Sequence, residues 1–260
     1  MALVSSRVET EGVLVLTLNR PDKLNALSAE LIRDLTAAAR EAAVAVATQS
    51  VRVVILESST SKAFCVGADL AERLSMDAEE VSETLAALRE LTETLAAVPV
   101  PTIAVLEGAA FGGGLELALC CDLRVCSPGA KLGLTETKLA ILPGAGGTQR
   151  LTRLIGEAKA KELIFLAKVL LGTEAKTYGL VHDCVVDPHA HARTWAATLL
   201  THGPLGVSQA KAAIEGGRGL SLAEGLDWER KCYQRVLESE DRVEGLQAFS
   251  KKRPPLYRGR

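Results

Sequence analysis

The side chains best suited to chemistry in this sequence are two glutamates in apolar surroundings. Glu116 is the only charged residue between positions 109 and 121, and it follows three consecutive glycines by two positions. Glu136 lies in a similar setting twenty residues later. A buried carboxylate is costly unless it is paired or its chemistry is needed. Glycines before a helix also let backbone N–H groups approach a ligand, so the pair predicts an acid–base site.

Simpler interpretations of the same residues stay open at this point. Glu116 could face solvent, or lie near a helix N-terminus for its favourable dipole. The three glycines could form only a tight turn. Glu136 has Thr135, Thr137 and Lys138 beside it, which is also typical of a solvated loop. Its case depends mainly on its spacing from Glu116.

The first half of the chain alternates strand and helix patterns. Apolar runs predict strands over residues 13–19, 51–57, 102–106 and 123–126. Between them, Ser28 is a candidate N-cap of one helix, and Asp77 with Glu80 forms a candidate capping box for another that Pro99 ends. Such alternation indicates βαβ units with right-handed crossovers, and therefore an α/β fold.

Strand patterns almost vanish after about residue 148. Helical periodicity is predicted for residues 150–170, 204–215, 221–237 and 241–252. We therefore predict an α/β core over residues 1–195 and a helical C-terminal region over residues 196–260.

Composition excludes several functional classes. The 260 residues are 48% hydrophobic and 24% charged, with a net charge of −2, as expected for a globular chain that binds neither nucleic acid nor an anionic membrane. No apolar stretch is long enough to span a membrane. The first ten residues are too short and too acidic for a signal or transit peptide, although removal of such a segment would leave no trace.

Known cofactor and metal motifs are absent from the sequence. Residues 144–149 begin like a dinucleotide fingerprint but have Gln149 where the last glycine should be, and no phosphate-binding loop or serine elbow is present. None of the six cysteines has Cys-x-x-Cys spacing, so we expect them to be packing residues. His182, His189, His191 and His202 fall in one loop-like stretch without metal-ligand spacing, so we predict surface residues and no metal.

Two loops follow predicted strands and are rich in small residues. One covers residues 64–70, and the other covers residues 107–116. If their strands are neighbours, both turns meet at one edge of the sheet, where α/β proteins bind ligands. Two backbone N–H groups meeting there would form an oxyanion hole for a carbonyl oxygen that gains negative charge.

These loops belong to a set of six ordered motifs that resembles the crotonase (enoyl-CoA hydratase/isomerase) family from about residue 8 to about residue 257. The motifs are NRPDKLNAL at 19–27, FCVGAD at 64–69, GGGLE at 112–116, LPGAGGTQRL at 142–151, AKTYGLV at 175–181 and EGLQAFSKKR at 244–253. Three further segments are most similar to the methylglutaconyl-CoA hydratase branch: ETKLAILP at 136–143, AKELIF at 160–165 and KRPP at 252–255.

The resemblance implies a fold, a site and an assembly. The fold is a crotonase-type spiral of ββα units with a helical C-terminal trimerisation region, assembled as a homotrimer or homohexamer. Glu116 and Glu136 match the catalytic glutamates, and Ala68 and Gly113 match the oxyanion-hole residues. The residues implied to contact coenzyme A (CoA) are Lys23, Leu24, Ala26, Asp69, Leu70, Phe249 and Lys252, the last two often across a subunit boundary. No separate cofactor is implied, because CoA is part of the substrate.

The expected activity is hydration of a 2-enoyl-CoA thioester, short-chain or branched, as in fatty-acid β-oxidation or branched-chain amino-acid breakdown. Glu116 would activate water and Glu136 would give a proton to C2. A methylglutaconyl-specific hydratase, an enoyl-CoA isomerase and an RNA-binding protein on the same fold are the alternatives. Leu134 and Thr135 depart from the Gln-Pro that many short-chain hydratases carry, and Ala71 replaces a frequent lysine. The resemblance suggests the mitochondrial matrix, and the cytoplasm is the alternative location.

Overall fold

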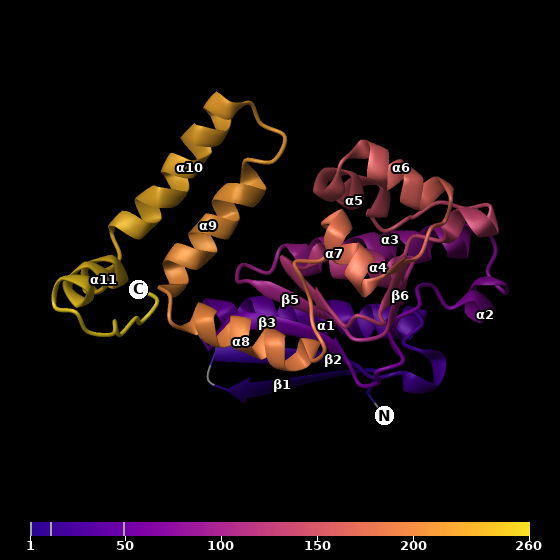
Figure 1. The fold of residues 1–260 in the computed structure, drawn as a ribbon, viewed down its shortest axis with the longest axis horizontal. Coiled ribbons are helices and arrows are strands. Elements are labelled where there is room, and N and C mark those ends of the chain that lie inside the picture. The colour runs from indigo at the N-terminus through magenta and orange to yellow at the C-terminus, as the bar shows by residue number, and fades with distance from the viewer. Residues whose placement is uncertain (1, 11, 49) are drawn as a thin grey trace.

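The computed structural model describes residues 2–10, 12–48 and 50–260 and consists of two sheets wrapped by helices (Figure 1). The strands are β1 (Val4–Thr10), β2 (Gly12–Leu18), β3 (Val51–Ser58), β4 (Ala63–Cys65), β5 (Thr102–Leu106), β6 (Ala109–Phe111), β7 (Leu123–Cys126), β8 (Lys131–Gly133), β9 (Leu170–Leu171) and β10 (Asp183–Cys184). The α-helices are α1 (Ala29–Ala47), α2 (Leu70–Arg73), α3 (Ala78–Ala96), α4 (Gly113–Cys120), α5 (Gly147–Ile155), α6 (Glu157–Phe165), α7 (Gly172–Tyr178), α8 (Pro188–Leu200), α9 (Pro204–Gly216), α10 (Leu222–Leu237) and α11 (Glu240–Ser250). Two short 3₁₀ helices complete the set, η1 (Pro21–Lys23) and η2 (Glu136–Leu139).

From β3 to β8, successive strands of the chain join the two sheets alternately. One sheet has the strand order β1-β2-β3-β5-β7-β10, and the other has the order β4-β6-β8-β9. Each turn of the chain adds one strand to each sheet and then a helix: β3, β4 and α3, then β5, β6 and α4, then β7, β8 and α5. The predicted α/β spiral of ββα units is therefore confirmed.

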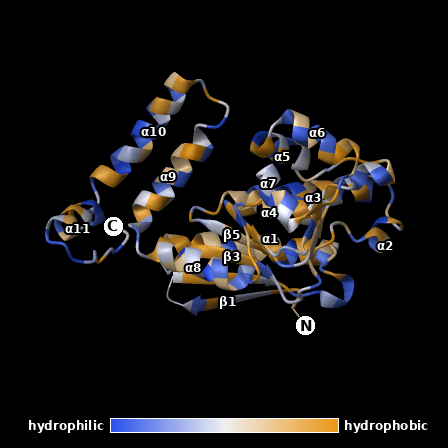
Figure 2. Cartoon of the chain, viewed as in Figure 1, coloured by the Kyte–Doolittle hydropathy of each residue, from blue (hydrophilic) through white to orange (hydrophobic). Residues whose placement is uncertain are grey.

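Both faces of the larger sheet are buried, which explains its nearly continuous apolar strands. Along β2, Leu14, Leu16 and Leu18 pack in the main core with α1 and α3, whereas Val13 and Val15 pack in a second cluster under α8. The central strands are correspondingly hydrophobic in Figure 2. The parallel pairing of β4 with β6 in the smaller sheet brings the loops after these strands, which contain Ala68 and Gly112, to the same edge. This edge carries the candidate site.

Local capping signals place the first two long helices as the sequence predicted. The hydroxyl of Ser28 accepts a hydrogen bond from the N–H of Leu31 at the start of α1. Asp77 and Glu80 form the predicted capping box of α3. The strands over 102–106 and 123–126 also have the predicted bounds.

Other elements differ from the sequence prediction. The helix expected over residues 150–170 is divided by Gly156, whose φ of +84° ends α5 before α6 begins. The histidine-rich stretch, predicted as a loop, contains α8, which starts with Asp187 as N-cap and Pro188 at its first turn. Proline suits that position, and the buried face of α8 consists of alanines too small to give a strong periodic signal. The exposed edge strand β1 was not predicted, because its sequence lacks an apolar run.

The C-terminal helices α9, α10 and α11 extend away from the sheets (Figure 1). The predicted boundary between residues 195 and 196 falls inside α8, which still packs on the core, so the two-part division stays a prediction. In the described part of the chain, no helix has the length and apolar character needed to cross a membrane.

Candidate active site

Glu116 lies in the first turn of α4, directly after the glycine-rich turn, and only 2% of its surface is exposed. Its Oε1 accepts hydrogen bonds from the backbone N–H groups of Ala145 at 2.8 Å and Gly147 at 2.6 Å. Burial raises the pKa of Glu116, while these two N–H groups and the charge of Arg150 oppose the rise. The carboxylate is thus removed from water but supported in its ionised form. The solvent-facing interpretation of Glu116 is wrong.

Glu136 begins the 3₁₀ helix η2, which the Thr137 hydroxyl fixes to α6 by donating to the Ile164 carbonyl at 2.8 Å. Burial, with a smaller contribution from the Glu116 charge, raises the pKa of Glu136 to about 7. Its Oε2 is buried and has no hydrogen-bond partner among the described residues. This carboxyl group therefore holds a proton more strongly than Glu116 does and has an oxygen free to interact with a ligand.

The two carboxyl groups lie on either side of the turn that starts α4. A Cβ atom built on Gly112 would lie 3.1 Å from Oε1 of Glu136, and one built on Gly113 would lie 4.0 Å from Oε2 of Glu116. The absence of side chains at these glycines leaves the space between the carboxyl groups open. The structure therefore places Glu116 and Glu136 at the same turn, and their catalytic roles stay a prediction.

The backbone groups of Ala68 and Gly113 also lie at this turn. A Cβ atom on Gly67 would be only 3.3 Å from the backbone nitrogen of Gly113, so the two loops are in direct contact. Ala68 and Leu27 form a parallel β-bridge. Its two hydrogen bonds run from the N–H of Leu27 to the carbonyl of Gly67 and from the N–H of Asp69 to the carbonyl of Leu27, so the N–H of Ala68 takes no part in the bridge. Gly113 is the first residue of α4, where helical N–H groups have no intrahelical acceptor.

The segment over residues 23–27 lies against the Ala68 loop. Arg20 joins the two, because its Nη1 donates to the Ala26 carbonyl at 2.9 Å and to Oδ2 of Asp69 at 2.7 Å. Lys23 and Leu24 are exposed beside this contact, whereas Ala26 is buried. The sequence-predicted residues at positions 23–26 and 68–70 are thus brought together at one edge.

Asp69 has structural roles here as well. Its Oδ1 caps α2 by accepting from the N–H groups of Ala71 and Glu72, and its Oδ2 pairs with Arg20. The adjacent Leu70 is 50% exposed and is available to contact a ligand.

Phe249 and Lys252 are not brought to this site within one chain. Both belong to the end of the chain around α11, which lies at the opposite end of the molecule from α2 (Figure 1). Phe249 is 87% exposed. Their proposed contact with CoA therefore requires a second subunit.

Sequence reasoning did not identify the residues that hold Glu116 or those that fix the loops around residues 26 and 69. Ala145 and Gly147 bind the carboxylate, and Arg150 and Arg20 fix two of the loops. The glycine-rich run at 144–149 is the available sequence signal, because such a run lets backbone N–H groups approach an anion.

The four histidines divide between surface positions and one charged cluster. His189 lies between two carboxylates, with Nδ1 at 3.0 Å from Glu57 and Nε2 at 3.2 Å from Glu107. Within the described residues, no group of three or more histidine, cysteine, aspartate or glutamate side chains could hold a metal ion.

Together, these groups form a site suited to acid–base chemistry on a carbonyl compound. Backbone N–H groups and Arg150 oppose the burial that raises the pKa of Glu116, whereas burial and the Glu116 charge raise the pKa of Glu136 to about 7. Environments that separate two carboxyl pKa values divide the acid and base roles between them. The backbone groups of Ala68 and Gly113 lie on two loops in contact at the same turn, and a pair of backbone N–H donors is what a developing oxyanion requires.

Comparisons with known proteins agree across nearly the whole chain. The family model described as enoyl-CoA hydratase/isomerase matches residues 8–260. The mitochondrial methylglutaconyl-CoA hydratase of Mus musculus is 45% identical over 257 residues, which cover 96% of this chain and 81% of that protein. The mitochondrial enoyl-CoA hydratase domain-containing protein 2 of Homo sapiens is 42% identical over 259 residues, which cover 96% and 87%. The crystal structure of an enoyl-CoA hydratase from Bacillus anthracis has a TM-score of 0.96 and 43% identity, covering 99% of this chain and 100% of that one.

Proposed function

The chain belongs to the enoyl-CoA hydratase/isomerase family, and we propose that it adds water across the 2,3 double bond of a 2-enoyl-CoA thioester. The observation that carries this proposal is the arrangement of the buried carboxyl group of Glu116 and the partly buried one of Glu136 at the Gly112–Gly113 turn. A hydratase needs both a base for water and an acid for carbon, and the pair has one group suited to each role.

In the proposed mechanism, the thioester oxygen accepts hydrogen bonds from the N–H groups of Ala68 and Gly113. This polarises the carbonyl, makes C3 electrophilic and stabilises the enolate-like charge on the oxygen. Glu116 removes a proton from water as it attacks C3, and Glu136 gives a proton to C2. The raised pKa of Glu136, about 7, supports its role as the donor, and the two N–H groups on Glu116 support its role as the base.

For CoA, we propose a binding edge along Lys23, Leu24 and Ala26 on one loop and Asp69 and Leu70 on the next. The contact that Arg20 makes with both loops supports a shared surface. CoA enters as part of the substrate, and no separate cofactor is proposed.

For the acyl group, we propose a branched substrate rather than a straight chain. Similarity to the mouse methylglutaconyl-CoA hydratase supports a branched substrate. Leu134, which stands where many short-chain hydratases have glutamine, is buried, and its side chain lies near the carboxyl group of Glu116 beside Gly147. The pathway would then be branched-chain amino-acid breakdown, whereas a straight-chain preference would indicate fatty-acid β-oxidation.

Steady-state assays of wild type, Glu116→Gln and Glu136→Gln test the proposal. The panel contains crotonyl-CoA, 3-methylglutaconyl-CoA and a 3-enoyl-CoA. We expect hydration by wild type and a loss of about 10²–10⁴ in kcat for each variant, because each removes one positioned acid–base group. Glu83→Gln, an exposed glutamate on α3, is the matched control and should retain wild-type rates. Conversion of the 3-enoyl-CoA to its 2-enoyl isomer without hydration would replace this proposal with an isomerase.

We also propose a homotrimer or homohexamer. Apolar side chains on the C-terminal helices are widely exposed in one chain, with Ile214 at 71%, Leu222 at 80% and Leu246 at 63%. Large apolar side chains exposed on neighbouring helices are typical of a subunit interface. Analytical ultracentrifugation checks the assembly, and a monomer at micromolar concentration would contradict it.

For the compartment, the mouse and human relatives named as mitochondrial support a mitochondrial location, and the bacterial relative supports the cytoplasm. Fractionation of the source cells with the hydratase assay distinguishes the two.

A further inference from the structure

The turn that binds Glu116 is itself held by an arginine that does not touch the glutamate. Arg150 lies on α5, one helical turn after Gly147, and its Nη1 donates to the carbonyl of Ala145 at 3.0 Å. Its Nη2 reaches the carbonyl of Thr92 on α3 at 3.5 Å. Ala145 therefore binds Glu116 through its N–H and Arg150 through its C=O.

Gly146, which lies between the two N–H donors, packs directly against the guanidinium group of Arg150. Gly146 has a φ of +100°, in the left-handed region that favours glycine. A Cβ atom at Gly146 would lie 2.1 Å from Nη1 of Arg150. The conformation of the turn and the position of the arginine thus depend on each other.

We propose that Arg150 is a positioning residue that keeps the 145–147 turn in the shape that binds Oε1 of Glu116. This inference rests on the proposed hydratase function, since it assigns a role to Arg150 through the catalytic base. With Arg150 in place, the N–H groups of Ala145 and Gly147 hold one carboxylate oxygen and leave Oε2 directed toward the Gly113 side of the turn, 4.0 Å from the position of a Cβ at Gly113. Without Arg150, the turn loses the hydrogen-bonded connection to Thr92 on α3.

The charge of Arg150 acts in the same direction as the hydrogen bonds. It lowers the pKa of Glu116 against the effect of burial. The other ionisable groups close to Glu116 are Glu136, which would repel the anion, and Cys120, a buried thiol with a pKa raised to about 12. Arg150 is therefore the nearby cation that favours the ionised base.

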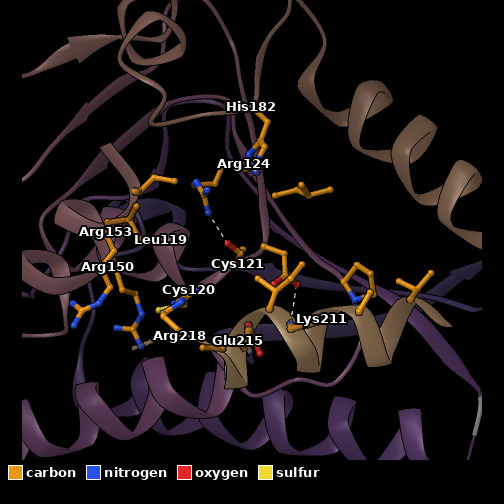
Figure 3. A pocket seen from close by; sticks show the side chains of 18 of the residues that line it. Leu119, Cys120, Cys121, Arg124, Arg150, Arg153, His182, Lys211, Glu215 and Arg218 are labelled. Carbon is orange, nitrogen blue, oxygen red and sulfur yellow. Dashed lines mark hydrogen bonds and ion pairs between the residues drawn. The ribbon is translucent and has the colours of Figure 1, made fainter. Parts of the chain in front are cut away.

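Arg153 provides a matched control. Arg150 and Arg153 both come from α5 and line the same cavity of about 800 Å³, between the end of α4 and α9 (Figure 3). Arg153, however, donates only to the backbone and side-chain oxygens of Gln149 on its own helix. Loss of a cation from the cavity is common to both substitutions, and loss of the contact to Ala145 is specific to Arg150.

The first test compares kcat and KM of wild type, Arg150→Met, Arg150→Lys and Arg153→Met with a 2-enoyl-CoA. We expect Arg150→Met to lower kcat by about 10²-fold with KM nearly unchanged, because a misplaced base costs turnover rather than CoA binding. We expect the kcat of Arg150→Lys to be roughly tenfold higher than that of Arg150→Met. A lysine ammonium can reach the carbonyl of Ala145, but it lacks the second nitrogen that also reaches the carbonyl of Thr92. Arg153→Met should stay within about twofold of wild type. Equal losses in both Met variants, or a kcat of Arg150→Met within about twofold of wild type, would overturn the proposal.

Gly146→Ala gives an independent perturbation of the same contact. Its Cβ displaces the guanidinium group, so we expect a similar loss of kcat and a double variant with Arg150→Met that loses much less than the product of the two effects. Multiplicative losses would overturn the shared role. If Arg150→Met does not fold, as judged by circular dichroism, Arg150→Lys and Gly146→Ala replace it in the comparison. A kcat within about twofold of wild type for both of these variants would then overturn the proposal.

A titration that does not depend on turnover separates this inference from the proposed function. The side-chain carboxyl ¹³C signal of Glu116, assigned with Glu116→Gln, is followed against pH in wild type, Arg150→Met and Arg153→Met. We expect its midpoint to move to higher pH only in Arg150→Met. An unchanged midpoint overturns the positioning role, whereas absence of hydration by wild type on every 2-enoyl-CoA overturns only the proposed function.

Discussion

At the scale of single residues, the site depends on two carboxyl groups of the same type that hold protons differently. Both are desolvated, which alone would raise both pKa values. Glu116 receives two backbone N–H groups and faces a cation, and these stabilise its anion. Glu136 has an unpaired buried oxygen and a neighbouring negative charge, and its pKa rises to about 7. The surroundings, rather than the residue type, divide the two roles.

The raised pKa of Glu136 predicts the pH dependence of the proposed reaction. Its protonated form is complete well below pH 7 and is lost as pH rises through about 7, so the proton donor disappears on the alkaline side. We therefore expect kcat/KM for hydration to fall above about pH 7, with a slope of one proton. The measurement is kcat/KM from pH 5.5 to 9.5, which reports the free enzyme.

A profile that stays flat between pH 6 and 9 would contradict Glu136 as the donor. The stability of the protein across this range, followed by circular dichroism, is the control. Because the two glutamates interact, the fitted values belong to the pair rather than to one residue.

At the scale of elements, the site exists because separate loops are tied together before any ligand binds. Arg20 joins the loop before α1 to the loop before α2 through the Ala26 carbonyl and Asp69. The Arg20 and Asp69 side chains are only 19% and 12% exposed, so their ion pair is shielded from solvent more than a surface pair. This tie positions the edge proposed to bind CoA.

Removal of this tie should weaken substrate binding more than turnover. We expect Arg20→Met to raise KM for the CoA thioester about tenfold, which corresponds to about 1.4 kcal/mol, with kcat changed by less than about threefold. Arg33→Met, which removes an exposed cation from α1 paired only with Asp34, is the control. Steady-state kinetics with crotonyl-CoA measure both constants.

A fall in kcat at constant KM for Arg20→Met would show that the ion pair serves the oxyanion loop rather than the CoA edge. Asp69→Asn should reproduce the effect of Arg20→Met, since it removes the other partner.

At the scale of the whole molecule, α9 to α11 extend from the core and carry exposed apolar side chains (Figures 1 and 2). Phe249 and Lys252 lie in this region, far from the site of their own chain. If they complete a neighbouring subunit's CoA site, then that site is assembled only in the oligomer.

Subunit mixing tests this arrangement. Phe249→Ala alone should raise KM for the CoA thioester, and Glu116→Gln alone should be nearly inactive. In mixed oligomers, we expect some sites to combine an intact Glu116 from one subunit with an intact Phe249 from the other, which restores activity with a wild-type KM. Mixed oligomers that keep the high KM of Phe249→Ala would show that each subunit uses its own α11.

The sequence by itself determined the central strands, the capped helices α1 and α3, the helical C-terminal region and the two glutamates. These follow from local periodicity, from side chains that bond to nearby backbone, and from ordered motifs, all of which are written in neighbouring residues. Only the tertiary structure decided what surrounds the glutamates. The N–H groups of Ala145 and Gly147 reach Glu116 across about thirty residues of chain, and Arg150 and Arg20 act through backbone carbonyls that carry no sequence signal. The helix α8 was likewise decided by packing, since its small buried alanines give no strong periodic signal. The break between α5 and α6 comes instead from Gly156, whose positive-φ backbone conformation the helical periodicity did not reveal.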